Sequence, residues 1–204
     1  MRRMNFQRTL ADRWQSLRQS RWLWPAIVSA AIAAAGAIVL KLEGRPWWCS
    51  CGQLWLWIED IHSPHNSQHL LDPYSITHVE HGIALWCLIV WSVPRMPATR
   101  RFCLAILIET LWEAIENSDA IIHRYRAATI ALGYEGDSMI NSLGDIASCA
   151  LGIALAGRLG TRASLVLLVV IELVLLFWIR DNLFLNILML FHPIQAIKTW
   201  QAGG

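Results

Sequence analysis

The chain has 204 residues, of which 55% are hydrophobic and 16% charged, and its mean hydropathy is +0.41. Soluble domains carry about 25% charged residues, so a chain this apolar does not cover a soluble surface. The composition excludes intrinsic disorder and a nucleic-acid binder, and the formal net charge of +2 conceals an uneven distribution of basic residues. We therefore predict an all-α, polytopic membrane helix bundle.

The first 22 residues are polar and basic, and large apolar side chains recur among them at helical spacing from Phe6 to Leu17. This pattern predicts an interfacial helix on the cytoplasmic face. The apolar run 23–42 then has the length of about 20 residues that a bilayer requires. We interpret this run as an uncleaved anchor rather than a signal peptide, because the basic segment before it is long.

Four further apolar runs predict spans, which brings the expected number to about five: 76–93, 101–119, 138–157 and 163–179. A polar stretch, 43–75, separates the first two spans, and a polar loop to Gly136 follows the third. The run 183–191 is too short to span. The expected organisation is a basic segment 1–22, a bundle 23–180 and a C-terminal interfacial or re-entrant segment 181–204.

Basic residues predict the orientation of these spans. With the N-terminus inside, eleven of the seventeen Lys and Arg residues fall on inner segments. The two short inner loops are purely basic; they carry Arg95, Arg100 and Arg101 in one, and Arg158 and Arg162 in the other. The positive-inside rule therefore predicts N-in and C-out, which makes 43–75 an outer loop.

Ionisable residues inside three spans are the main functional signal. Such residues are expensive in a bilayer and mark functional sites by default. They form stripes with helical spacing near the outer ends of their spans, where they can satisfy one another only by converging. The stripes are His78 and His81 in the second span; Glu109, Glu113 and Glu116 in the third; and Asp137, Asn141 and Asp145 from the fourth.

These stripes supply the candidate site. We expect catalytic roles for His78, His81, Glu113, Glu116, Asp137 and Asp145, with Glu109 and Asn141 as the floor or wall. His78, His81, Glu113 and Asp145 are candidate ligands for a divalent metal. Candidate substrate-binding residues, two of them arginines suited to a phosphate or a lipid headgroup, are Arg124, Tyr125, Arg126, Tyr74, Asn117 and Asn141. A purely structural polar network, or simple interfacial anchoring by the arginines, is the competing interpretation.

The outer loop offers a weaker signal. His65 and His69 could share a helical face with Asp72, which is a spacing suited to metal ligands. Asp72 before Pro73 also has the pattern of a helix N-cap, and Asp137 after Gly136 allows the same interpretation. Cys49 and Cys51 lie on the predicted oxidising side, but a bridge between residues two apart would be strained.

Several motifs in order carry a resemblance to a known family: Ser67-Gln68-His69, Asp72-Pro73-Tyr74-Ser75, His78-Val79-Glu80-His81-Gly82, Trp112-Glu113-Ala114-Ile115-Glu116-Asn117-Ser118, Tyr125-Arg126, Tyr134-Glu135-Gly136-Asp137-Ser138, Asn141-Ser142 and Asp181-Asn182-Leu183. Over most of 47–200 the chain resembles uncharacterised protein family 0314, bacterial multi-pass membrane proteins with a domain of unknown function. The resemblance implies a cell-membrane location and no particular activity. The order of His, Glu-rich helix, Arg and spaced Asp residues is also similar, in pattern only, to VanZ-like membrane proteins.

Two classes of function fit these expectations. The first is an intramembrane hydrolase or transferase at the outer leaflet of the bacterial inner membrane, acting on a lipid or lipid-linked substrate, with or without a divalent metal. The second is a non-enzymatic assembly or binding factor, or a proton-coupled carrier, that uses the same polar network. Membrane lipid is the expected partner in either class.

Overall fold

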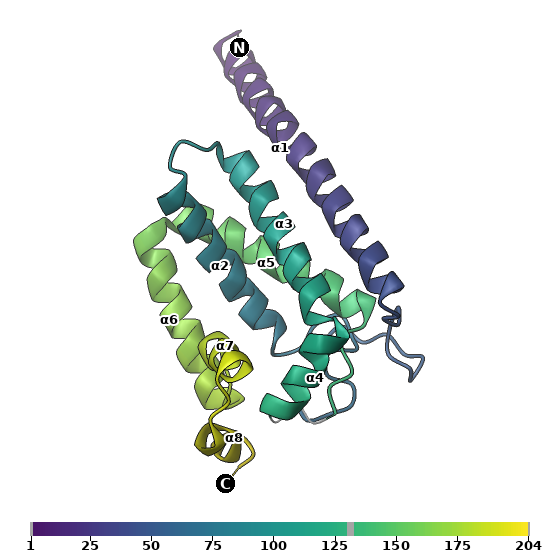
Figure 1. Ribbon diagram of the computed structural model, residues 1–204. Helices are drawn as coiled ribbons and strands as arrows, with labels where there is room; N and C mark the ends of the chain where they lie inside the picture. The colour runs from purple at the N-terminus through teal and green to yellow at the C-terminus, as the bar shows by residue number, and fades with distance from the viewer. Residues whose placement is uncertain (1, 130–132, 204) are drawn as a thin grey trace.

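The computed structural model describes residues 2–129 and 133–203. Within these residues the chain forms eight α-helices and no strand, which confirms the all-α class (Figure 1). The helices are α1 (Arg2–Leu42), α2 (Ser75–Ser92), α3 (Ala98–Glu116), α4 (Asp119–Ala128), α5 (Met139–Leu159), α6 (Thr161–Trp178), α7 (Leu183–Phe191) and α8 (Gln195–Gln201).

Three of the described helices are long and apolar enough to cross a membrane: Trp22–Leu42, Met139–Leu159 and Thr161–Trp178. They correspond to the first, fourth and fifth predicted spans. The second and third predicted spans are the continuous helices α2 and α3, whose composition is diluted by the polar stripes.

The N-terminal segment and the first span form one helix of 41 residues. The sequence predicted a separate interfacial helix before the span, but no break lies between them. Pro25 is inside the helix and does not end it. A proline removes one helical hydrogen bond and bends the backbone, and without a glycine or an adjacent turn signal the helix continues beyond it.

The segment after the third predicted span contains a helix, although its polar sequence predicted a loop. The expected loop up to Gly136 contains α4, and α3 ends at Glu116 rather than near residue 119. Ser118 stands at the α4 N-terminus in an extended conformation, and Asp119 places a negative charge in the first turn. Negative charge at this position favours a helix. The side chains of Ile122 and Tyr125 on α4 are buried against the bundle.

Helices α2 and α5 pack closest together, because glycine faces glycine at their crossing. A Cβ atom at Gly82 would overlap the carbonyl of Cys149, and one at Gly152 would overlap the carbonyl of Val79. Small residues at such crossings let two backbones approach within the membrane. Ile83, Ile146 and Ile153 fill the adjoining core. This contact holds the two polar stripes of α2 and α5 side by side.

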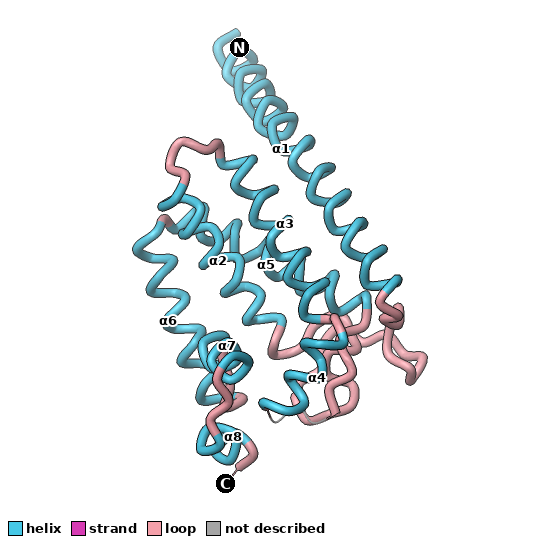
Figure 2. The backbone as a smooth tube through the Cα atoms, viewed as in Figure 1, coloured by secondary structure: helices cyan, strands magenta, loops and turns pink. Residues whose placement is uncertain are grey.

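Most of the irregular structure gathers at one end of the bundle. The long segment between α1 and α2 lies there with α4, α7 and α8, while the N-terminus and the short connections α2–α3 and α5–α6 lie toward the other end (Figure 2). This segment joins the N-terminus of α5 directly: the N–H groups of Met139 and Ile140 donate to the carbonyls of Pro46 and Trp47. The polar stripes open toward this end.

Candidate functional site

The site begins where α2 begins. Asp72 lies just before the helix, and its Oδ1 accepts the backbone N–H of Tyr74 at 2.8 Å and of Ser75 at 3.3 Å. Asp72 therefore caps the turn that leads into α2, whereas Tyr74 holds the N-cap position of the helix itself. Its Oδ2 accepts the N–H of Ser67 at 2.9 Å and the side-chain amide of Asn141 at 3.3 Å. The cap thus fixes the depth of His78 one turn into α2.

Glu109 lies between the two histidines of α2. Its Oε1 is 2.5 Å from Nδ1 of His78, and its Oε2 is 3.1 Å from Nδ1 of His81. The sequence placed Glu109 in the stripe and expected it only as floor or wall, whereas the structure puts it at the centre. A carboxylate that bonds to Nδ1 fixes the tautomer of an imidazole and leaves Nε2 as the reactive nitrogen.

Two further carboxylates approach His78 from α3 and α5. Glu113 Oε1 is 3.3 Å from Nδ1 of His78, and Asp145 Oδ2 is 3.9 Å from its Nε2. His78, Glu113 and Asp145 present ligand atoms within 4.8 Å of one another, as do His78, His81 and Glu109. The three stripes therefore converge, and a single cation has enough ligands here to be held by three helices.

Four buried carboxylate oxygens in this cluster have no hydrogen-bond partner among the described residues: both of Glu113, Oε2 of Glu116 and Oδ1 of Asp145. A buried acceptor without a partner costs about 1–3 kcal/mol, and more when it is charged. Glu113 Oε1 has only the ion-pair contact of 3.3 Å with His78 Nδ1, so these oxygens need a proton, a water molecule or a cation as a partner.

Asp137 differs from these carboxylates because its oxygens are satisfied. Its Oδ2 accepts the Asn117 amide at 2.9 Å and its Oδ1 accepts the Tyr134 hydroxyl at 3.0 Å. The Asp137 N–H donates in turn to Oδ1 of Asn117 at 2.6 Å. Burial raises the pKa of Asp137, and the Asn117 amide counters that shift. Asp137 and Asn117 tie the start of α5 to the end of α3.

A cavity of about 570 Å³ leads from the irregular end of the bundle to His78. Its acidic lining residues are Glu116, Glu135, Asp137, Asp145 and Asp181, and no Lys or Arg of the described chain lines it. Tyr74 and Tyr125 add hydroxyl groups to the wall, and the Tyr74 hydroxyl donates to Asp181 at 3.2 Å. Burial raises the pKa of Asp181 to about 7. The cavity therefore suits a cation far better than an isolated anion.

The two arginines of α4 do not line this cavity. Arg124 donates from Nε to the carbonyl of Leu190 at 2.7 Å and from Nη2 to that of Phe191 at 3.3 Å, at the C-terminal end of α7. Arg126 donates to the carbonyl of Tyr134. Both guanidinium groups therefore join backbone segments: Arg124 binds the C-terminal end of α7, where a cation is favoured, and Arg126 binds the segment that precedes α5. Arg124, Tyr125 and Arg126 were all predicted to bind a substrate, but only Tyr125 lines the cavity.

The predicted loop ligands separate into two places. His65 and His69 lie with Cys49 and Cys51, in a group that shares no residue with the cavity cluster. Asp72 is not a member of that group and is occupied at the start of α2. Residues 61–69 form turns rather than the helix that would have aligned His65, His69 and Asp72 on one face.

Comparison with known proteins decides the family. A family described as "Protein of unknown function (DUF2585)" matches residues 40–203. A UPF0314 protein of Sphingopyxis alaskensis is 43% identical over 185 residues, which cover 91% of this chain and 97% of the relative. The chain belongs to the UPF0314 family. A UPF0314 protein of Rhizobium meliloti is 41% identical over 195 residues, 96% of this chain and 99% of the relative.

The resemblance drawn from the ordered motifs is thereby confirmed. A UPF0314 protein of Paracoccus denitrificans is 40% identical over 194 residues, which cover 95% of this chain and 99% of that protein. No solved structure matches the chain. The UPF0314 name carries no activity, so any function must be argued from the cavity and its side chains.

Proposed function

We propose that this UPF0314 protein crosses the bacterial inner membrane five times, through α1, α2, α3, α5 and α6, with its N-terminus inside and its C-terminus outside. The three apolar helices and the basic connections α2–α3 and α5–α6 support this topology. Those connections lie toward the N-terminal end of α1, away from the α1–α2 segment and from α4 (Figure 1). Residues of that segment and of α4 line the cavity. The cavity then opens toward the outer leaflet.

The chemistry that this cavity supports best is cation-assisted hydrolysis or group transfer on a lipid or lipid-linked substrate. The carrying observation is the set of carboxylate oxygens of Glu113, Glu116 and Asp145 that have no hydrogen-bond partner in the described chain. They lie beside His78, and Glu116, Asp145 and His78 line the cavity. A divalent cation bound there would satisfy them and polarise a substrate oxygen or a water. It would also supply the positive charge that the lining lacks for a phosphate-bearing substrate.

The remaining residues have distinct expected roles. Glu109 orients His78 through Nδ1, so Nε2 is available as a general base or a ligand. His81 shares Glu109 and completes the same group of ligand atoms. Asp137, Asn117 and Asn141 position the helix ends, while Tyr74 and Tyr125 contact a substrate in the cavity.

The test is a reaction screen on purified protein in lipid nanodiscs. Bacterial lipid extract is incubated with the protein and with Mg²⁺, Mn²⁺ or Zn²⁺, and products are sought by mass spectrometry. His78→Gln and Asp145→Asn should each reduce turnover by at least about 100-fold, the usual contribution of a positioned acid or base. Glu80→Gln is the matched control, because Glu80 is a buried α2 carboxylate outside the cavity lining. Turnover that survives both cavity variants contradicts the proposal.

One observation favours a second function, a proton-coupled carrier. His81, Glu109 and His78 form a hydrogen-bonded chain of titratable groups, and Asp145 in the cavity lies 3.9 Å from Nε2 of His78. Such chains relay protons in pumps and transporters. Proton flux into proteoliposomes that is abolished by Glu109→Gln, without lipid turnover, would support the carrier over the enzyme. A folded protein with neither activity would support an assembly or binding factor.

A further inference from the structure

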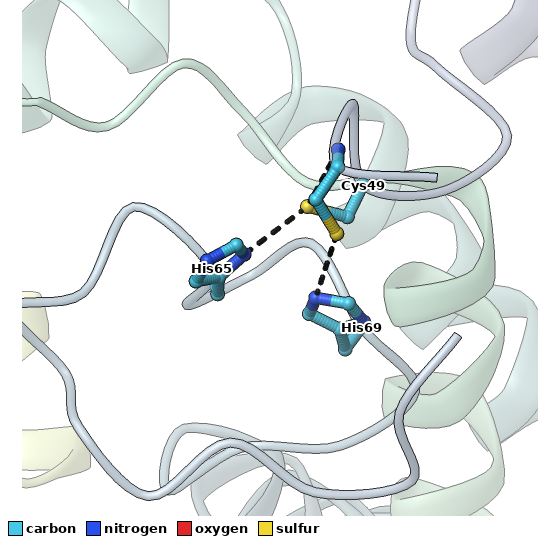
Figure 3. Close-up of side chains that lie close together, drawn as sticks. Cys49, His65 and His69 are labelled. Carbon is cyan, nitrogen blue, oxygen red and sulfur yellow. Dashed lines mark hydrogen bonds between the residues drawn. The ribbon is translucent and has the colours of Figure 1, made fainter. Parts of the chain in front are cut away.

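The outer loop between α1 and α2 holds a second group of potential ligands, built on turns. Cys49 and Cys51 both lie in one tight turn, in which the Gly52 N–H donates to the Cys49 carbonyl at 3.1 Å. His65 and His69 come from the turns that follow Pro64. Figure 3 shows both imidazoles directed at the cysteine turn, with Cys49 facing His65.

The spacing of the ligand atoms matches a tetrahedral metal. Cys49 Sγ lies 3.3 Å from Nδ1 of His65, and Cys51 Sγ lies 3.9 Å from Nε2 of His69. All four atoms lie within 4.8 Å of one another. Zinc–sulfur bonds of about 2.3 Å and zinc–nitrogen bonds of about 2.0 Å place S and N about 3.5–3.6 Å apart at a tetrahedral angle. The two measured distances lie on either side of that value.

We propose that Cys49, Cys51, His65 and His69 bind a structural Zn²⁺ ion. Two thiolates and two imidazoles in a tetrahedral arrangement are the ligand set that zinc prefers. All four positions are filled by protein, which characterises structural rather than catalytic zinc. The His65–His69 spacing is that of known zinc sites, whereas the single residue between Cys49 and Cys51 is shorter than usual.

Aromatic packing already orients one of the imidazoles. The Trp55 ring stacks on His69 with centroids 4.7 Å apart and contacts the edge of His65 at 5.1 Å. The backbone N–H of Trp55 donates to Nδ1 of His69 at 3.1 Å. In the metal-free chain the imidazole proton of His69 is therefore on Nε2. Zinc at Nε2 displaces that proton, and if the proton moves to Nδ1, the Trp55 N–H must leave its acceptor. Residues around Trp55 are therefore expected to shift when zinc binds.

Zinc at this position would hold one wall of the cavity in place. The loop carries Ser50, His62, Asn66 and Gln68 into the lining. It is attached to α5 through the Ser138 N–H, which donates to the Ser67 carbonyl at 2.9 Å. Zinc would join 49–51 to 65–69, and because the unfolded chain has no preformed site, the free energy of zinc binding stabilises the folded loop.

The experiment measures metal in the full chain, purified without chelators, by elemental analysis against protein concentration. The zinc content should fall by about one equivalent per chain, relative to the wild type, in Cys51→Ser and in His65→Asn. The matched controls are His62→Asn, from the same loop, and Cys103→Ser, from α3; neither residue belongs to the group of four ligands, so both should retain zinc. His78→Gln should also retain it, so loss of the cavity cation would leave this result unchanged.

A second measurement covers variants that fail to fold. Wild-type protein, stripped with a chelator under reducing conditions, is titrated with ZnCl₂ and with Co²⁺, whose visible absorption reports tetrahedral thiolate ligation. One equivalent of Zn²⁺ that protects both thiols from alkylation supports the proposal. Zinc retained in His65→Asn, zinc lost equally in His62→Asn, or a reduced wild-type protein that takes up none would each overturn it. The proposal would also be overturned if the purified protein folds only when Cys49 and Cys51 form a disulfide.

Discussion

The two ligand clusters of this protein are built in opposite ways. The cavity cluster stands on α2, α3 and α5, where helical periodicity aligns the side chains of each stripe and glycine contacts hold α2 against α5. The loop cluster stands on turns, where the cysteines and histidines meet without regular secondary structure. The first is held by packing of the whole bundle, and the second depends on its own ligands. Perturbations should therefore separate them.

The largest effect is expected from a variant that disrupts the packing of α2 against α5, on which the cavity cluster depends. Gly152→Val places a side chain against the Val79 carbonyl and forces α2 away from α5. We expect a loss of more than about 3 kcal/mol in unfolding free energy, at the upper end for overpacked sites. Denaturant unfolding in detergent measures it. The control is Gly133→Ala, where an added Cβ meets no atom within 4 Å; an equal loss in both variants would contradict the packing argument.

The next prediction compares two buried carboxylates of the bundle. Glu109→Ala should lower the free energy of unfolding by about 3 kcal/mol, because it leaves the imidazoles of His78 and His81 without their shared acceptor. Glu80→Leu should be neutral or stabilising, since both Glu80 oxygens are buried without partners in the described chain. The same unfolding assay checks both. A destabilising Glu80→Leu would show that Glu80 has a role within the folded protein.

A smaller effect tests the role of Arg124. Because its guanidinium binds the carbonyls of Leu190 and Phe191, Arg124→Ala should cost about 1–2 kcal/mol and loosen α7. Hydrogen exchange of 183–191 should quicken in the variant. Binding to anionic lipid vesicles should be unchanged. Weaker vesicle binding, with exchange as in the wild type, would instead restore the headgroup role predicted from sequence.

The last effect concerns pH at Asp181, and it is the smallest when it is measured over a single pH unit. The pKa of Asp181 is raised by burial to about 7, above its unfolded value of about 3.9. The folded chain then binds the extra proton between these values, so this group makes stability fall as the pH rises from about 4 to 7. The slope from one such group is at most about 1.4 kcal/mol per pH unit. Asp181→Asn should flatten that part of the melting-temperature profile, and an unchanged slope would contradict the assignment.

Much of the bundle follows from sequence because helices impose a period. The apolar runs predicted every long helix, and spacings of three and four residues predicted that His78, Glu113 and Asp145 would face inward. The same reasoning misjudged the segment after α3, because α4 is short and polar and owes its order to Ile122 and Tyr125 packing on the bundle. The sequence also predicted that Arg124 and Arg126 bind a substrate, whereas both bind backbone carbonyls in the structure. No local sequence pattern reveals which distant carbonyl a guanidinium group will reach.

The sequence by itself determined the all-α class, the apolar helices long enough to span a membrane, the family and the three polar stripes, because composition, ordered motifs and helical periodicity are all local properties of the chain. Only the tertiary structure decided that Glu109 joins both histidines and that the cavity lining is acidic. Only the tertiary structure brought Cys49 and Cys51 to His65 and His69. Turns have no period to read, so the contacts of residues 14–20 positions apart are settled by loop closure and by packing against α5.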